Sequence, residues 1–542
     1  MRVLITGMGG ELGTRVANLL EADESVTEIM GMDLFPPRRR IFRSEFHRVE
    51  PTDRRKAVHL VRDFDPEVVL HLGVFEPHSR TSPSEARRGT AASAVSVLGA
   101  AARCPSLQAI VVRSGIEVYG RSRGAPTRPD ESVAIEPTSP FGQSLAHVEQ
   151  VAVEAGDVAG VPVTAVRCAP IVGPSIPSPL GRYLRLPVVA VDPLSELPFS
   201  LLHQEDACQA MVAAATAAHD GPLNVVGPGA VTASQAVLMG RRVPLPVFGP
   251  GWWGAAAIAE LQGAPLPPHA RELLVRGCTA DGTLARAVLG IDPRPTHDVV
   301  SQLYRWDTVA HPALRPGRTA LSTSLLRRGV PGAQVLAQVQ RRARGAYDVD
   351  EWGLDPELVA LSNPVFGLRW DIEVRGGDKL PAVGGAVLVF NRRFGLSEPW
   401  VVARGIRQAT GRFVRTVGVP DVAPVGPFIR RFGGVLDRTD EIAGLLRAGQ
   451  LVGLPMSRDL RSRERVGHLD VERLEAAIET GTPVVPVALV GRELGRAWTI
   501  VVGEPVPPVA DGGPLAAAEL AESTHRAAQL LLDASLPTSW WF

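Results

Sequence analysis

The stretch MRVLITGMGGELG, residues 1–13, decides the fold of the first part of this 542-residue chain. An apolar run, Val3 to Ile5, ends at a glycine, and glycines recur at intervals of three before a segment with apolar residues at helical spacing. This pattern is typical of a strand, a tight turn and a helix that together bind the pyrophosphate of a dinucleotide. Gly7, Gly10 and Gly13 are therefore the first candidate cofactor-binding residues.

A second strand is predicted over residues 28–32 and ends at Asp33. A carboxylate about 20 residues after the glycines binds the ribose hydroxyls of NAD and disfavours the 2′-phosphate of NADP. We therefore expect NAD as the cofactor. Three consecutive arginines, Arg38, Arg39 and Arg40, leave NADP open as an alternative.

Composition indicates an ordinary globular protein with two or more domains. The 57 basic and 57 acidic residues cancel, so no bias toward nucleic acid is expected. No apolar run reaches the length of a transmembrane helix, and the N-terminus enters a strand directly, which predicts a cytoplasmic protein without a signal peptide. The four cysteines are scattered, so the sequence predicts neither a metal site nor disulfides.

Further strands are predicted over residues 46–53, 67–74, 106–114 and 161–168, with helices between them. Strands that alternate with helices indicate an α/β fold with a doubly wound parallel sheet, a Rossmann domain. A small cap is expected over residues 175–305, which places the first domain at residues 1–310.

Seven motifs follow one another in an order that resembles the extended short-chain dehydrogenase/reductase family, the sugar-nucleotide epimerases and dehydratases. The resemblance implies an NAD-binding Rossmann domain and adds Gly73 to the cofactor-binding residues. The motifs are TGMGGELG (6–13), Asp33, VLHLG (69–73), RSGIEVYG (113–120), SPFGQSL (139–145), VRCAPIVGP (166–174) and LLHQEDACQA (201–210).

In that family a Ser or Thr, a Tyr and a Lys carry out the proton transfer that accompanies hydride transfer. Gly115, Phe141 and Leu145 occupy those positions here. Phenylalanine has no ionisable proton and leucine no donor, so the resemblance predicts that this chemistry is lost. Other polar residues lie near these positions, but the sequence shows no convincing replacement among them: Ser114, Glu117, Tyr119 and His147.

Residues 311–347 contain seven arginines and no acidic residue, punctuated by proline and glycine. We predict a basic linker with a short helix over residues 334–344. Two interpretations stay open: the arginines rest on anionic phospholipid, or the linker is simply solvated.

Residues 348–542 are predicted to form a second domain, which is similar to the phospholipid/glycerol acyltransferase family in four blocks. The resemblance implies a second α/β fold. The blocks are VLVFNRRFGLSEP (387–399), PVGPFIRRFGGVLDR (424–438), LRAGQLVGLPMSRDLRSR (446–463) and ETGTPVVPVALVG (479–491).

The catalytic groups of that second family are also replaced. Its general base, a histidine, and the aspartate that orients it correspond to Arg392 and Ser397, and arginine stays protonated. Arg438 stands where the family has a phosphate-binding arginine. We expect one groove that binds acyl-CoA or an anionic phospholipid, lined by Asn391, Arg392, Ser397, Arg438, Pro455, Met456 and Ser457.

These observations lead to one hypothesis and two alternatives. The hypothesis is a bacterial pseudoenzyme, cytoplasmic or peripheral at the inner face of the membrane, which joins an NAD-binding domain to a lipid- or acyl-binding domain. Its role would be binding, sensing or scaffolding in lipid or cell-envelope metabolism. The alternatives are an active lipid acyltransferase with atypical catalytic groups and a regulatory nucleotide-binding domain, and a sugar-nucleotide epimerase/dehydratase-type oxidoreductase.

Overall fold

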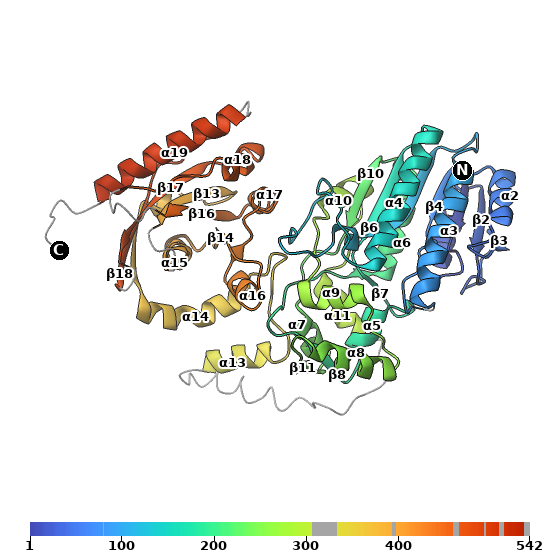
Figure 1. Ribbon diagram of the computed structural model, residues 1–542, viewed down its shortest axis with the longest axis horizontal. Helices are drawn as coiled ribbons and strands as arrows, with labels where there is room; N and C mark the ends of the chain where they lie inside the picture. The colour runs from blue at the N-terminus through green and yellow to red at the C-terminus, as the bar shows by residue number, and fades with distance from the viewer. Residues whose placement is uncertain are drawn as a thin grey trace. The chain divides into compact units, whose positions relative to one another are not determined.

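The chain forms two compact units, Met1–Glu351 and Trp352–Phe542 (Figure 1). The computed structural model describes residues 1–79, 81–305, 333–392, 397–458, 465–492, 495–508 and 514–535. The boundary between the two units falls four residues after residue 347, where the linker was predicted to end. The reason is that Val349 pairs with Ala230 and the carbonyl of Tyr347 accepts a hydrogen bond from Gln235, so these residues pack onto the first unit.

The predicted basic linker lies mostly outside the described residues. Its predicted helix is present as α13, Ala333–Arg342. No helix in the described parts of the chain is long and apolar enough to cross a membrane.

The first unit is built on a seven-stranded sheet in the order β10-β6-β5-β4-β1-β2-β3. Every neighbouring pair is parallel, which confirms the predicted doubly wound Rossmann sheet. The strands are β1 (Arg2–Thr6), β2 (Glu28–Asp33), β3 (Glu45–Arg48), β4 (Val68–His71), β5 (Ala109–Gly115), β6 (Val163–Cys168) and β10 (Gly221–Val225).

The central strands are apolar on both faces because helices cover both sides of a parallel sheet. All residues of β4 are buried, as are Val3 to Ile5 of β1. Figure 1 shows α3, α4 and α6 running alongside the strands. The covering helices are α1 (Glu11–Glu21), α2 (Arg54–Phe64), α3 (Pro83–Ala101), α4 (Pro140–Ala159) and α6 (Gln204–Ala217).

The predicted strands exist but are shorter than expected, for local reasons. The strand expected to reach residue 53 ends at Arg48, because Pro51 has no amide hydrogen to donate and Asp53 caps α2 by accepting from the amide of Lys56. The strand expected from residue 106 begins at Ala109, because Ser106 is hydrogen-bonded to the side chain of Asp65.

The region predicted as a cap, residues 175–305, contributes α6 and β10 to the Rossmann unit and also forms a small sheet of its own. Its two-stranded parallel sheet pairs β8 with β11, and its tryptophans divide between Trp252, which is buried, and Trp253, which is exposed. The cap and the segments that join it to the Rossmann sheet comprise η1 (Ile116–Tyr119), β7 (Ile171–Val172), α5 (Pro179–Leu184), β8 (Val188–Val191), β9 (Leu202–His203), α7 (Ala233–Met239), β11 (Val243–Pro246), α8 (Gly251–Leu261), α9 (Pro268–Arg276), α10 (Thr283–Leu289) and α11 (Thr296–Arg305).

The second unit contains a seven-stranded mixed sheet in the order β12-β18-β17-β13-β16-β14-β15. Only the β17·β18 pair is antiparallel among its described strands, so the α/β character predicted for this domain is confirmed. The strands are β12 (Asp371–Arg375), β13 (Ala386–Arg392), β14 (Val414–Val417), β15 (Gly434–Val435), β16 (Leu451–Arg458), β17 (Val484–Gly491) and β18 (Ala497–Val502).

Side chains of β13 alternate between two apolar clusters, one on each face of this sheet. One cluster includes residues of α17, α18 and α19, and the other includes residues of α15, so helices cover both faces. The helices are α14 (Pro356–Arg369), α15 (Glu398–Thr410), α16 (Val425–Arg431), α17 (Thr439–Arg447), α18 (Glu475–Glu479) and α19 (Pro514–Ser535), with two short turns, η2 (Gly377–Lys379) and η3 (Glu472–Leu474).

Candidate functional site

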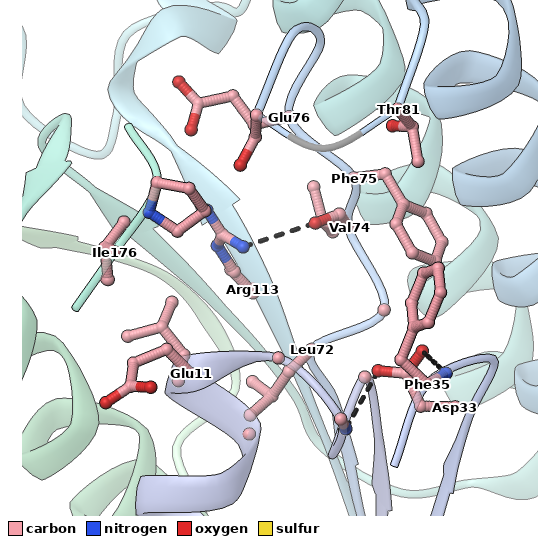
Figure 2. Close-up of a pocket in the computed structure, with 18 residues that line it drawn as sticks. Glu11, Asp33, Phe35, Leu72, Val74, Phe75, Glu76, Thr81, Arg113 and Ile176 are labelled. Atoms are coloured by element: carbon pink, nitrogen blue, oxygen red, sulfur yellow. Dashed lines mark hydrogen bonds between the residues drawn. The ribbon is translucent and has the colours of Figure 1, made fainter. Parts of the chain in front are cut away.

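A cleft of about 810 Å³, open to solvent, lies at the carboxyl ends of β1, β2 and β4 (Figure 2). Ligands of open α/β sheets bind at this edge. The cleft is lined by the glycine turn after β1, by Asp33 and Phe35 after β2, and by residues 72–76 after β4. All predicted cofactor-binding residues line it: Gly7, Gly10, Gly13, Asp33 and Gly73.

The glycines are required by close contacts. Gly7 has a positive φ of 71°, and a Cβ at Gly13 would lie 2.2 Å from the carbonyl oxygen of Gly7. A Cβ at Gly73 would lie 2.9 Å from Ser93 Oγ. At Gly10 the nearest atom to an added Cβ would be the Gly7 oxygen at 3.2 Å, so this glycine is less tightly enclosed by protein.

The amino end of α1 faces the cleft and suits an anion. Its N-cap is Gly10, so no side chain caps the amides of the first turn. Amides at a helix N-terminus together with the helix dipole favour phosphate. Glu11 also lines the cleft, but it accepts from Arg15 Nε at 2.8 Å and from Arg39 Nη2 at 3.2 Å, so its charge is balanced.

The Asp33 carboxylate is held by backbone amides. It accepts from Gly9 N at 2.9 Å and from Leu34 N at 2.6 Å. Burial raises the pKa of Asp33 above its ordinary value, and the backbone donors oppose that shift. Of the three arginines that left NADP open, Arg39 pairs with Glu11 and Arg40 stacks over Phe42 at 5.1 Å.

Two charged residues that the sequence analysis missed stand at the other end of the cleft. Arg113 extends from β5, and its Nη1 donates to the Val74 carbonyl at 3.3 Å. Figure 2 shows Arg113 and Glu76 on the side of the cleft opposite Phe35 and Phe75. Both charged residues also line a second cavity of about 470 Å³. Arg113 begins the motif RSGIEVYG, but the motif gave it no role, and Glu76 lies outside every motif that the sequence analysis used.

The second cavity brings together the three positions where the catalytic residues are replaced. Gly115, Phe141 and Leu145 all line it, and Phe141 and Leu145 are buried one turn apart on α4. An added Cβ at Gly115 would lie 2.3 Å from the Glu117 Oε2 atom, so the glutamate carboxylate occupies the space beside this glycine.

Two of the polar residues near these positions belong to a buried network. Ser114 donates to Glu149, which forms an ion pair with Arg167 at 2.7 Å. Arg167 also donates to the Tyr119 hydroxyl at 2.9 Å, and that hydroxyl donates to Asn224 at 2.9 Å. Burial raises the pKa of Tyr119 to about 12.

His147 is exposed on α4, whereas Glu117 lines the second cavity. Of the four polar residues considered from the sequence, Ser114 and Glu117 line this cavity beside the positions of the lost catalytic groups, and Ser114 is hydrogen-bonded to Glu149. The sequence analysis did not consider His269, which reaches this cavity from the cap helix α9.

In the second unit several predicted groove residues have structural partners. The side-chain amide of Asn391 exchanges two hydrogen bonds with the backbone of Leu489, and Met456 is 1% exposed. These two side chains are buried, and their place in a groove stays a prediction. Pro455 is buried in β16, and Ser397 is buried at the N-cap of α15.

Arg438 has a partner on its own segment, since it donates to the Asp440 carboxylate at 3.0, 3.3 and 2.8 Å. Ser457 accepts from the amide of His468 at 2.8 Å, and Arg392 ends β13. A groove through these residues stays a prediction.

Residues 3–226 match the model of the NAD dependent epimerase/dehydratase family. The first unit therefore contains an NAD-dependent epimerase/dehydratase-family domain, as its motifs predicted, and the match supports NAD as the cofactor. An acyltransferase relationship of the second unit stays a prediction.

Individual relatives span part of the chain. An uncharacterized protein of Mycobacterium tuberculosis is 29% identical over 314 residues, which cover 54% of this chain and 80% of the relative. The UDP-glucose 4-epimerase of Azospirillum brasilense is 27% identical over 190 residues, 33% of this chain and 51% of that enzyme.

Among solved structures, the Thermotoga maritima UDP-glucose 4-epimerase with UDP-glucose has a TM-score of 0.45 at 17% identity, covering 56% of this chain and 98% of that one. MoeE5 in complex with UDP-glucose and NAD has a TM-score of 0.42 at 21% identity, with coverage of 56% and 98%.

Proposed function

We propose that the first domain binds NAD in the cleft at the carboxyl ends of β1, β2 and β4. The observation that carries this proposal is the pairing of an uncapped helix N-terminus at Gly10 with a backbone-held carboxylate at Asp33, both on one cleft. The pyrophosphate would be held by the amides of the first turn of α1. The adenosine ribose would donate its hydroxyls to Asp33.

NAD is favoured over NADP on electrostatic grounds. A 2′-phosphate on the ribose would lie against the Asp33 carboxylate, and like charges repel. Arg39 could offset that repulsion only by leaving Glu11, which lines the phosphate end of the same cleft. The nicotinamide would extend toward Arg113 and Glu76, where bound NAD supplies a hydride acceptor.

The domain would not use the proton-transfer residues of its family, because Phe141 and Leu145 offer no group that exchanges a proton. We therefore propose NAD binding for this domain and assign it no reaction here. Calorimetric titration with NAD, NADH and NADP tests it. Heat of binding with NAD or NADH, and weaker or no heat with NADP, is the expected result, whereas no heat with any of the three would refute it.

For the second domain we propose docking on an anionic membrane surface. The proposal is supported by α14, of which no residue is buried although its sequence is largely apolar. Val365 and Leu368 on α14 are 67% and 77% exposed, and Phe428 on α16 is 57% exposed. Apolar and aromatic side chains of this kind suit a membrane interface.

Aromatic contacts join α14 to neighbouring elements, and arginines lie on or beside the helix. Phe366 of α14 lies 5.6 Å from Trp400 and 6.2 Å from Phe432, ring centre to ring centre, so an aromatic cluster ties α14 to its neighbours. Arg404 donates to Asn363 on α14 at 3.0 Å, and Arg369 ends the helix. Each basic residue near an anionic surface contributes about 1 kcal/mol. Acyl-CoA binding, or acyl transfer by atypical groups, would be a separate property of this domain.

A further inference from the structure

In the second cavity of the first unit a histidine of the cap lies beside Phe141, the residue at the family's tyrosine position. His269, at the start of α9 in the cap, packs its ring on Phe141, with ring centres 4.7 Å apart and an angle of 41° between the planes. The imidazole therefore lies directly against the side chain that replaces the family's proton-transfer residue. His269 is 7% exposed, so protein atoms surround most of its side chain.

The imidazole is fixed by a carboxylate. Its Nε2 lies 3.2 Å from Glu76 Oε1, although 193 residues separate the two in the sequence. Glu76 follows β4 and lines both the dinucleotide cleft and the second cavity. When Nε2–H of a neutral imidazole donates to a carboxylate, Nδ1 is left as a proton acceptor.

Other charged groups surround this pair. Arg113 lines both cavities from β5, and Glu117 lines the second cavity from η1. Burial raises the pKa of Glu117, and the charges of His269 and Arg113 oppose that shift while Glu76 adds to it. These four side chains thus line one cavity at the end of the cleft where the nicotinamide would lie.

We propose that His269, positioned by Glu76, is a catalytic residue that exchanges the proton of a substrate hydroxyl in place of the missing tyrosine. The inference rests on the proposed binding of NAD. In the oxidising direction the O–H bond of a secondary alcohol breaks, and its proton passes to Nδ1 of His269. The electron pair of the adjacent C–H bond leaves as hydride to the nicotinamide, so the alcohol becomes a ketone and the dinucleotide is reduced.

Glu76 is a positioning residue in this scheme. It selects the tautomer with Nε2–H and stabilises the imidazolium that forms. Substrates of this class are secondary alcohols, such as the hexose ring of a nucleoside-diphosphate sugar. The proton acceptor would come from the cap, not from α4 as in the family's Tyr–Lys arrangement.

The tautomer provides a test that needs no activity. Nitrogen-15 NMR of the imidazole side chains in the full chain, at alkaline pH and without dinucleotide, should show the Nε2–H tautomer for His269. The His269→Gln variant assigns the signal by its loss. A His269 signal with the Nδ1–H tautomer would overturn the proposal, because no acceptor would then face the substrate.

Kinetics provide the second test, with NAD and UDP-glucose as the probes and the absorbance of the reduced nicotinamide as the signal. His269→Gln should slow single-turnover reduction by about 10² or more, while the Kd for NAD changes by less than about twofold. Glu76→Gln should lower kcat more than it changes KM and should displace the pH profile. His147→Gln, which changes an exposed histidine of α4, is the matched control and should behave as the wild type.

The outcomes separate the two proposals. If NAD fails to bind the wild type, the proposed function fails. If NAD binds but UDP-glucose reduces none of it, or if His269→Gln turns over as fast as the wild type, the role of His269 is refuted while NAD binding stands.

Discussion

The amide of Gly9 donates to the carboxylate of Asp33 at 2.9 Å, which joins the glycine turn directly to the acid at the end of β2. The two halves of the proposed dinucleotide site are therefore one hydrogen-bonded unit. Leu34 N donates to the other carboxylate oxygen at 2.6 Å, so the carboxylate is fixed before any ligand arrives.

The first prediction concerns the charge of Asp33. Asp33→Asn should weaken NAD binding roughly tenfold or more, since a hydrogen bond to a charged group contributes about 1.5–3 kcal/mol. Burial raises the pKa of Asp33, so this carboxylate takes up a proton at a higher pH than an exposed aspartate does. The affinity of the wild type for NAD should therefore begin to fall at that higher pH on acidification. Calorimetry from roughly pH 8 to pH 4.5 checks this. The pH-dependent step should be absent from Asp33→Asn, and an equal step in both proteins would contradict the assignment.

The second prediction compares two glycines of the same turn. Gly13→Ala should destabilise the fold by about 1–3 kcal/mol, because its Cβ would lie 2.2 Å from the Gly7 carbonyl oxygen. Gly10→Ala should cost less stability, since its nearest contact would be 3.2 Å, yet it should weaken NAD binding by crowding the phosphate site. Thermal unfolding and calorimetry are measured for both. Equal loss of stability in the two variants would show that the tight contact at Gly13 costs no more stability than the looser contact at Gly10.

The third prediction tests the buried ion pair of Glu149 with Arg167, whose atoms lie 2.7 Å apart. Glu149→Ala should lower the free energy of unfolding by about 3–5 kcal/mol, because it leaves the arginine buried without its counter-charge. Glu154→Ala, which changes an exposed residue on the same helix, is the control and should stay within about 0.5 kcal/mol. Urea unfolding followed by circular dichroism gives both values. A loss below about 1 kcal/mol for Glu149→Ala would mean that Arg167 finds another partner.

Local features of the sequence predicted the glycine turn and Asp33, because one β-α-β segment contains both, and the alternation of strands with helices predicted the Rossmann sheet. Strand ends were less accurate, since prolines and side-chain caps such as Asp53 decide them. The roles of Tyr119 and Ser114 needed the tertiary structure, which joins both to Glu149 and Arg167. The contact of His269 with Glu76 spans 193 residues and two parts of the fold, so no spacing rule could reveal it.

The fourth prediction concerns membrane docking by the second domain. The full chain should float with liposomes that contain anionic phospholipid, and less so at high salt, because screening weakens arginine contacts. Val365→Glu with Leu368→Glu should reduce flotation, since both side chains are exposed on α14. Leu530→Glu on α19, 65% exposed, is the matched control and should float as the wild type does. Equal recovery with neutral and anionic vesicles would contradict a role of charge in docking. An equal loss of flotation in the α14 variant and in Leu530→Glu would exclude α14 as the docking face.

The central claim is that the cleft between the glycine turn and Asp33 holds NAD, and a crystal structure of the full chain grown with saturating NAD tests it most directly. We expect density for the pyrophosphate at the first turn of α1, beside Gly10, and for the adenosine ribose within hydrogen-bonding distance of the Asp33 carboxylate. The nicotinamide should point toward Arg113 and Glu76. An empty cleft at saturating NAD, or a dinucleotide bound elsewhere on the chain, would contradict the account.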